Sequence, residues 1–360
     1  MHAVEFQDVT KAFHGRKAID GVSLSIEPGS FTVICGPPKA GKSVLFRLLV
    51  GLEQADSGRI LLEGRDITHA PPSGRNIGYV PQSFALYPHM SVFENIAYPM
   101  RLAKAPREET ARRVDQTAAM LSITHLLKKT PDQLSGGEKQ RVAVARGLMK
   151  DAHVFVLDDP LVGLDYKLRE RLMDEMKQLC EALKTTFVYA TSDSLEALTL
   201  AQSLVVLEAG RLVEHGPAVD MYLEPRNVRS LEVIGFPRAN ILDAGTSGGE
   251  ARIAGFSFRL PPGIASSRLL LGIRPEHVLV GTGGPGRAGR VAIVEHLGSE
   301  IVLYADVDGV SLTAAYPAEN AIGAPPIDSA VTVAVQPESV MVFDRESGRF
   351  LGRCTGGAAA

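Results

Sequence analysis

The chain has 360 residues, of which 45% are hydrophobic and 22% are charged. Single hydrophobic cores usually stop growing at roughly 250 residues, so we expect a larger and a smaller domain. The 38 Lys and Arg residues against 41 Asp and Glu give a net charge of −3, which excludes an overall basic field that would attract nucleic acid or acidic lipid.

No stretch approaches the roughly 18 to 20 apolar residues that span a bilayer, and the start MHAVEFQDVT lacks a basic region followed by an apolar run. We therefore expect the protein to stay in the cytoplasm and to reach a membrane only through a protein partner. Cys35, Cys180 and Cys354 have neither paired spacing nor a metal-ligand pattern, so we expect them to be structural in a reducing compartment.

In the first part of the chain, predicted strands alternate with predicted helices, which is typical of a parallel α/β sheet. Alternating apolar positions in VEFQDV, VSLSI and FTVICG predict strands, and the last of these leads into a Gly-rich turn and the amphipathic helix KSVLFRLLVGL. Further strands at VFVLDD, TTFVYAT and SLVVLEA alternate with helices near residues 167–183 and 194–200. We expect this α/β domain to span residues 1–235.

Between these strands the pattern becomes helical from Ser91 to Met149, with breaks at Pro106 and Pro131. We therefore expect a helical subdomain, at about residues 88–150, inserted into the α/β domain.

After about Gly235 the sequence pattern changes to short β-type runs such as RLLLGI, RVAIVEHL and EIVLYADV, separated by Gly and Pro clusters. This pattern predicts a small β-barrel domain of the OB-like kind over residues 236–352. The remaining tail, residues 353–360, is expected to be disordered.

Residues 36–43 fit the phosphate-loop pattern G-x-x-x-x-G-K-[ST], and they follow a predicted strand and open a predicted helix. In such a loop main-chain N–H groups cradle phosphates, Lys42 neutralises the β and γ charge, and Ser43 binds magnesium. The alternative is a chance Gly/Lys turn. The candidate ATP-binding residues here are Gly36, Pro37, Pro38, Lys39, Ala40, Gly41, Lys42, Ser43 and Val44.

The strand VFVLDD ends in two acids, Asp158 and Asp159. Asp158 can hold a magnesium ion through its water shell, and Asp159 can face the water that attacks the γ-phosphate. A buried strand capped by acids is common, so this reading depends on its pairing with the phosphate loop.

The segment LSGGEKQR matches the ABC family signature LSGGxxQR at every fixed position, and on it the chain is identified as a member of the ABC ATPase family. The resemblance implies a P-loop NTPase fold, ATP and Mg²⁺ as cofactors, and two subunits that close head to tail over ATP. Ser135 and the glycines precede a helix, whose dipole favours an anion, although Ser135 could be a simple helix cap. The residues implied to act on the partner's ATP are Leu134, Ser135, Gly136, Gly137, Glu138, Gln140 and Asp165.

Three further positions fall in the family's order. Phe13 is similar to the aromatic that stacks on adenine, and Gln82 looks like the glutamine that senses γ-phosphate and magnesium and begins the coupling segment. Asp165 lies in the stretch LVGLD, which resembles the loop that crosses the dimer interface. Taken alone, Phe13 fits a core position, Gln82 a surface turn, and Asp165 the N-cap of the next helix.

The β-rich end carries LGIRPEH at residues 271–277 and VEHLG at residues 294–298, which resemble the accessory (TOBE-like) barrel of carbohydrate-importer ATPases such as those for maltose and glycerol-3-phosphate. RPEH is also compatible with a salt-bridged turn. The resemblance therefore covers nearly the whole chain and implies a sugar, polyol or glycerol-phosphate solute.

The chain departs from the family around its own nucleotide. The family's catalytic Glu is replaced by Asp159, and its switch histidine by Ser192. Pro38 and Lys39 replace Ser and Gly, and Val44 replaces a hydroxyl residue that would touch the α-phosphate. Proline contributes no N–H, whereas Lys39 adds charge, so we expect ATP binding to survive better than turnover.

We therefore expect a weakly hydrolytic importer subunit, peripheral on the cytoplasmic side of the plasma membrane. Its partners would be a non-identical sister ATPase, two transmembrane permease subunits and, indirectly, an extracytoplasmic solute-binding protein, with no nucleic acid. The alternatives are a fully active homodimeric sugar-importer ATPase, a non-hydrolysing ATP sensor and a soluble repair or translation ABC protein. The last of these would carry paired cassettes, basic surfaces or coiled coils.

Overall fold

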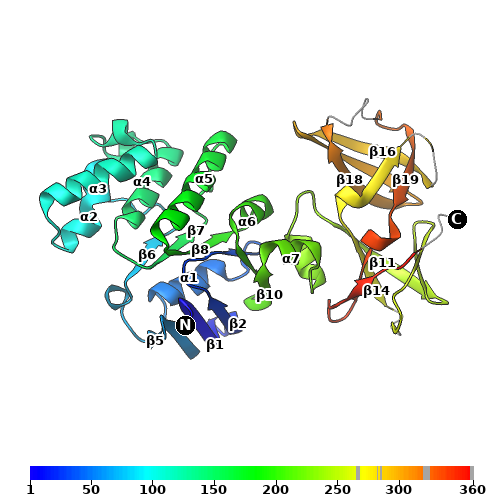
Figure 1. Ribbon diagram of the computed structural model, residues 1–360, viewed down its shortest axis with the longest axis horizontal. Coiled ribbons are helices and arrows are strands. Elements are labelled where there is room, and N and C mark those ends of the chain that lie inside the picture. Colours follow the sequence, from blue (N-terminus) through cyan, green and yellow to red (C-terminus); the bar gives the residue numbers. More distant parts are fainter. Residues whose placement is uncertain (265–267, 282, 284–285, 319–324, 357–360) are drawn as a thin grey trace. The chain divides into compact units, whose positions relative to one another are not determined.

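The computed structural model describes residues 1–264, 268–281, 283, 286–318 and 325–356. The chain forms two compact units, Met1–Ala218 and Val219–Ala360 (Figure 1). The domain boundary expected near residue 235 lies inside the second unit.

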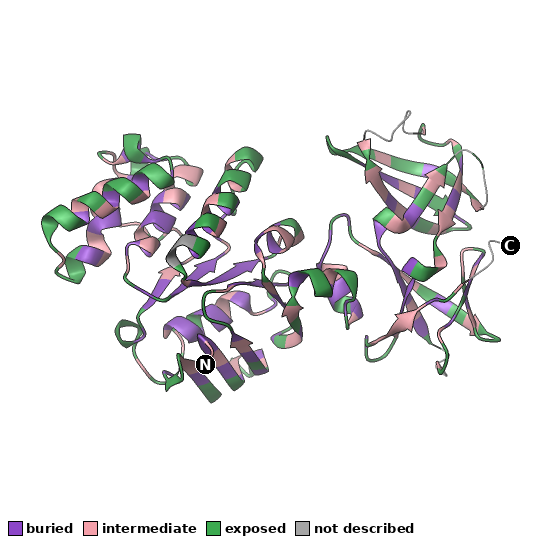
Figure 2. Ribbon diagram, viewed as in Figure 1, coloured by how far each residue is buried: buried purple, intermediate pink, exposed green. Residues whose placement is uncertain are grey.

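The first unit is built on a six-stranded sheet in the order β10-β9-β3-β8-β7-β6. Neighbouring strands are parallel except for β10, which runs antiparallel to β9. Strands β3, β7 and β8 are buried along their whole length, as their continuous apolar sequences predict for parallel strands (Figure 2). The six strands are β3 (Phe31–Cys35), β6 (Ile77–Val80), β7 (Val154–Asp158), β8 (Thr186–Thr191), β9 (Ser203–Glu208) and β10 (Arg211–Pro217).

A second, antiparallel sheet has the order β2-β1-β4-β5. Phe6, Val22 and Ile60 from this sheet share one buried cluster with Leu45 and Phe46 of the helix that follows the phosphate loop. That shared cluster fixes the start of the helix against both sheets. The four strands are β1 (Val4–Phe13), β2 (Arg16–Ile26), β4 (Ser57–Leu62) and β5 (Arg65–Asp66).

The inserted helical subdomain is confirmed, because α2, α3 and α4 lie between β6 and β7 in the chain and pack on one another. α2 and α4 each begin with a capping box, formed by Ser91 with Glu94 and by Ser135 with Glu138. No described helix is long and apolar enough to cross a membrane. The helices of the first unit are α1 (Lys42–Val50), α2 (Val92–Leu102), α3 (Arg107–Met120), α4 (Gly136–Leu148), α5 (Tyr166–Leu183) and α6 (Ser194–Leu200).

The second unit is the expected small β-barrel domain, with two sheets in the orders β13-β12-β11-β14-β20-β21 and β15-β19-β16-β17-β18. Their inner faces share one apolar cluster, in which Leu303 and Val333 are fully buried. Its elements are α7 (Ala218–Leu223), α8 (Val228–Val233), β11 (Asn240–Ser247), β12 (Glu250–Ile253), β13 (Phe256–Arg259), β14 (Leu269–Ile273), β15 (Val278–Gly281), β16 (Arg287–His296), β17 (Glu300–Val307), β18 (Val310–Pro317), β19 (Ala330–Val335), β20 (Met341–Asp344) and β21 (Phe350–Arg353).

The RPEH turn is held mainly by main-chain carbonyls. The guanidinium of Arg274 donates to the carbonyl of Ile234 at 2.8 Å and to that of Tyr222 at 3.1 Å, and it lies 3.6 Å from the centre of the Tyr222 ring. The hydroxyl of Tyr222 donates to Glu276 at 2.6 Å. Through these contacts the turn attaches α7 and the segment after α8 to the barrel.

The expected disordered tail is only partly described, because residues 357–360 lie outside the described residues. Within residues 353–356, the N–H of Thr355 donates to the carbonyl of Arg259 at 3.0 Å. Cys35, Cys180 and Cys354 are all free and buried.

Candidate nucleotide site

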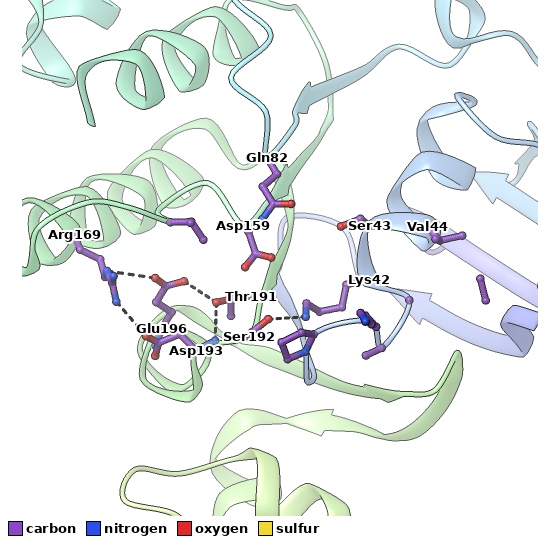
Figure 3. Close-up of a pocket in the computed structure, with 16 residues that line it drawn as sticks. Lys42, Ser43, Val44, Gln82, Asp159, Arg169, Thr191, Ser192, Asp193 and Glu196 are labelled. Atoms are coloured by element: carbon purple, nitrogen blue, oxygen red, sulfur yellow. Dashed lines mark hydrogen bonds and ion pairs between the residues drawn. The ribbon is translucent and has the colours of Figure 1, made fainter. Parts of the chain in front are cut away.

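A cavity of about 740 Å³ lies beyond the carboxyl ends of β3, β7 and β8, where ligands of parallel α/β sheets usually bind. Most of the predicted ATP-binding residues line it, together with residues from the loops after β7 and β8 (Figure 3). The cavity is lined by Ala18, Pro38, Lys39, Ala40, Gly41, Lys42, Ser43, Val44, Gln82, Asp159, Val162, Arg169, Thr191, Ser192, Asp193 and Glu196.

Lys42 is the first residue of α1, and its ammonium group lies at the centre of the loop. Its Nζ donates to the carbonyl of Gly36 at 2.7 Å, to that of Pro37 at 3.3 Å and to Oγ of Ser192 at 2.8 Å. Burial lowers the pKa of Lys42, and the nearby charge of Asp159 opposes that change. The loop thus holds the ammonium group of Lys42 at the cavity, with the N-terminus of α1 beside it.

The N-terminus of α1 has no side-chain cap, so its first main-chain N–H groups are available to an anion. Gly41 precedes it with a φ of 107°, and a Cβ there would lie 2.6 Å from the carbonyl oxygen of Ala18. Only glycine fits this position. Lys39 has a φ of 69°, a conformation that is unfavourable for a residue with a Cβ and that glycine would adopt freely.

The two acids at the end of β7 lie near enough to Lys42 for their charges to act on it. Oγ of Ser43 donates to Oδ1 of Asp158 at 2.9 Å. Burial raises the pKa of Asp158, partly opposed by that hydrogen bond, and the charge of Asp159 raises it further. Burial also raises the pKa of Asp159, while Lys42 lowers it.

This group of oxygen donors fits a magnesium ion. Mg²⁺ is usually held by one or two carboxylates plus phosphate oxygens, and Ser43, Asp158 and the amide of Gln82 supply such donors here. Among the described residues there is no cluster of three His, Cys, Asp or Glu side chains that would hold a metal unaided. The ion would therefore bind together with the nucleotide, and it would polarise the phosphate oxygens.

Beyond Ser192 the cavity wall is a hydrogen-bonded cluster. Arg169 of α5 pairs with Asp193 at 3.1 Å and with Glu196 of α6 at 3.6 Å. Glu196 also accepts hydrogen bonds from the hydroxyls of Tyr189 and Thr191, both at 2.8 Å. This cluster fixes the turn that presents Ser192 to Lys42.

Phe13 does not line the cavity. Its side chain is 38% exposed, at the end of β1, and Nζ of Lys11 lies 5.3 Å from the centre of its ring. An exposed ring of this kind remains compatible with stacking on a base.

The signature residues also lie outside the cavity, at the start of α4. Oγ of Ser135 accepts from the N–H of Glu138 at 3.3 Å, and the N–H of Ser135 donates to Oε2 of Glu138 at 2.7 Å. A Cβ at Gly136 would meet no described atom within 4 Å, so the face beside the cap is open. Gln140 points inward instead, being 1% exposed with no hydrogen-bond partner for Nε2 among the described residues. Asp165 caps α5, accepting from the N–H of Leu168 at 3.0 Å.

Sequence reasoning missed six lining residues. The one available signal was Asp193, whose position directly before the helical stretch marks it as an N-cap: Oδ1 accepts from the N–H groups of Leu195 and Glu196. The missed residues are Ala18, Val162, Arg169, Thr191, Asp193 and Glu196.

Comparison with known proteins decides the family. The ABC transporter family model matches residues 19–162, and a TOBE domain model matches residues 271–343. A curated relative from Ruegeria pomeroyi is 36% identical over 97% of this chain and 99% of its own length, and one from Cereibacter sphaeroides is 38% identical over 98% and 100%. Both are called sn-glycerol-3-phosphate import ATP-binding protein UgpC. The chain belongs to the ABC transporter ATP-binding proteins.

Solved structures agree with this assignment for the first unit. The dimeric post-hydrolysis structure of an ATP-binding cassette bound to ADP and Pi is 28% identical, with a TM-score of 0.56 over 60% of this ABC protein and 98% of that chain. The structure of cbiO1 from Clostridium perfringens, part of the ABC transporter complex cbiONQ, gives 28% identity and a TM-score of 0.57 over 62% and 91%. The predicted ABC ATPase fold is confirmed, and the chain is an ATPase of this class.

Proposed function

We propose that this ABC protein energises an importer for glycerol-3-phosphate or for a related polyol or carbohydrate. The names of relatives that match it end to end support this solute class. As an import ATP-binding subunit like these relatives, it would work with two transmembrane permease subunits, peripherally on the cytoplasmic side. An extracytoplasmic solute-binding protein would deliver the solute to them.

The two halves of the chain's ATPase machinery would have unequal roles. The signature helix keeps a complete capping box and every fixed residue of its motif. The chain's own cavity, in contrast, has Asp159 and Ser192 at the two positions where the family has Glu and His. From this one-sided pattern we infer that the chain binds Mg·ATP, hydrolyses it slowly, and provides its signature to a non-identical sister ATPase.

The physical reason is the shorter length of one side chain and the missing charge of the other. Asp159 is one methylene shorter than Glu, and a misplacement on the order of 1 Å can reduce a rate roughly a hundredfold. Ser192 carries no cation, and its hydroxyl binds Lys42 at 2.8 Å. Lys42 and the free N–H groups of α1 still supply charge and donors for phosphates, so binding does not depend on either replacement.

Turnover and binding of the purified full-length chain test this proposal, with Lys42→Ala as the matched control. We expect saturable binding of labelled ATP with Mg²⁺ and little turnover, and loss of binding in the control. Rapid hydrolysis that Lys42→Ala abolishes would refute the division of roles, and absence of saturable ATP binding would refute the nucleotide site altogether.

The second candidate is a fully active homodimer. One observation favours it: Asp159 lines the cavity, and burial raises its pKa, which brings a carboxylate closer to the basicity of an efficient general base. The same turnover measurement separates the two candidates, since a homodimer hydrolyses ATP without a sister subunit.

A further inference from the structure

The phosphate loop contains a turn whose backbone suits glycine but which carries a lysine. The N–H of Ala40 donates to the carbonyl of Pro37 at 3.1 Å, so these four residues form a hydrogen-bonded β-turn. Pro38 occupies its second position, which proline favours, and Lys39 its third, with a φ of 69°. This is the pattern of a type II turn, whose third position normally holds glycine or asparagine. Unfavourable conformations of this kind are typical of functional sites, so the Lys39 side chain is a candidate for a function.

The ammonium group of Lys42, the best-placed cation of the loop, has an acceptor for each of its three hydrogens. Two are the carbonyls of Gly36 and Pro37, at 2.7 and 3.3 Å, and the third is Oγ of Ser192 at 2.8 Å. Figure 3 shows the bond to Ser192, which stands where the family has histidine. A phosphate oxygen can therefore bind Lys42 only by replacing one of these acceptors.

Lys39 and Arg169 are the other cationic residues among those that line the cavity. Arg169 pairs with Asp193 and Glu196, so its charge is compensated within the cavity wall. Lys39 is exposed, and no described residue forms a hydrogen bond or an ion pair with its ammonium group. Of the described residues that line the cavity, Lys39 is therefore the cation whose charge and three donors remain available to a ligand.

The composition of the loop increases the need for such a cation. Pro37 and Pro38 have no main-chain N–H, so the turn offers a phosphate fewer donors than a loop without proline. Ser192 supplies a hydroxyl but no charge. ATP has one more phosphate group than ADP and therefore more negative charge to compensate in the cavity. The free charge of Lys39 would thus attract ATP more strongly than ADP.

We propose that Lys39 binds the terminal phosphate of ATP and determines the preference of this cavity for ATP over ADP. It would supply, from the phosphate loop, the positive charge that Ser192 lacks in the turn after β8. A site that hydrolyses slowly and prefers ATP would stay occupied by ATP while the sister site turns over. The inference rests on the proposed function, in which the chain binds Mg·ATP in this cavity.

Equilibrium binding of Mg·ATP and Mg·ADP to the full-length chain tests this role. Lys39→Asn removes the charge but tolerates the left-handed conformation, and we expect it to lower the affinity for ATP about tenfold. The affinity for ADP should fall about twofold or less. Lys39→Arg keeps the charge and should preserve most of the preference for ATP. In the wild type the ratio of the two affinities should fall as salt rises, and in Lys39→Asn it should depend less on salt.

Lys39→Gly separates a binding role from a structural one. Glycine adopts the φ of Lys39 freely, so this variant should melt at the same temperature as the wild type or higher. It should nevertheless lose the preference for ATP to the same extent as Lys39→Asn. A merely structural role of the side chain would not give unimpaired stability together with a selective loss of ATP affinity.

Lys104→Gly is the matched control. Lys104 is also an exposed lysine in the left-handed region, with a φ of 58°, but it lies in the turn after α2 and is not among the residues that line the cavity. Its variant should bind ATP and ADP as the wild type does.

Three results would overturn the proposal. They are an equal loss of affinity for both nucleotides in Lys39→Asn, an unchanged ratio of affinities in that variant, and a ratio lost as fully in Lys39→Arg or Lys104→Gly. Absence of saturable Mg·ATP binding by the wild type would instead refute the proposed function.

Discussion

Asp158 is a buried carboxylate that we expect to destabilise the folded chain at neutral pH. Its pKa in the folded state lies above that of a free aspartate, chiefly because of burial. In Asp158→Asn the neutral amide can still accept the hydrogen bond from Ser43 but carries no buried charge. We therefore expect this variant to have a higher melting temperature than the wild type at pH 7.5 in the absence of nucleotide, measured by circular dichroism.

The size of this stability difference depends on pH in a defined way. Because the folded-state pKa is raised, the folded chain holds the proton more tightly, so stability falls as pH rises from the unfolded-state pKa through the folded one. The advantage of Asp158→Asn should be full above that window and vanish at the acidic end. Asp115→Asn, an exposed change on α3, is the control variant, because it removes a carboxylate that is not buried.

Asp159 and Ser192 are the replacements to which we assign the slow turnover that we propose. Asp159→Glu restores the missing methylene and Ser192→His a ring that can contact γ-phosphate. We expect the double variant to hydrolyse ATP faster than the wild type by on the order of a hundredfold, with smaller gains from each single change. Steady-state phosphate release measures this, and the gain should disappear when Lys42→Ala is added. An unchanged rate in the double variant would show that the limit lies elsewhere.

Residues of the phosphate loop were predictable from sequence because they are consecutive and their spacing is set by one turn. Lys42, Ser43 and Asp159 do meet in one cavity. Arg169 and Glu196 were not predictable, since they belong to different helices and reach the same wall only through the tertiary arrangement of α5 and α6. The inward position of Gln140 was missed for the same reason: a motif gives a residue's place in the chain but not the face of its helix.

At the scale of elements, α4 packs closely on β6 at Gly147. A methyl group at Gly147 would overlap the Val80 side chain, so we expect Gly147→Ala to lower the free energy of unfolding by about 1–3 kcal/mol. Urea denaturation measures the change. Gly136→Ala on the same helix meets no neighbour and should not destabilise the fold. Because alanine favours a helix more than glycine does, an equal loss in both variants would not come from helix propensity and would contradict the role assigned to the contact.

Elements with a strong pattern were predicted well. The continuous apolar runs became β3, β7 and β8, and Pro106 and Pro131 mark the starts of α3 and of a short 3₁₀ turn, as expected. Pro99, by contrast, lies inside α2 without ending it. The short helices α7 and α8 gave no usable signal, because six residues are too few to show a helical period.

For the whole molecule, the separate apolar clusters of the two units predict two unfolding transitions. Leu303→Ala, at a fully buried barrel position, should destabilise only the barrel transition, by about 2–5 kcal/mol. Mg·ATP should raise the midpoint temperature of only the other transition, because a ligand stabilises the unit that binds it. Differential scanning calorimetry of the full chain measures both. A single transition that both changes shift together would show that the units unfold as one.

The capping box at the start of α4 has a consequence for how fast the proposed pair of subunits could close. Ser135 and Glu138 bind each other's main chain within the free subunit, so this turn is already rigid before a partner arrives. The entropy of ordering it is lost on folding and does not oppose association. Closure would then resemble, on this side, the docking of a preformed surface, with a rate governed by encounter and orientation.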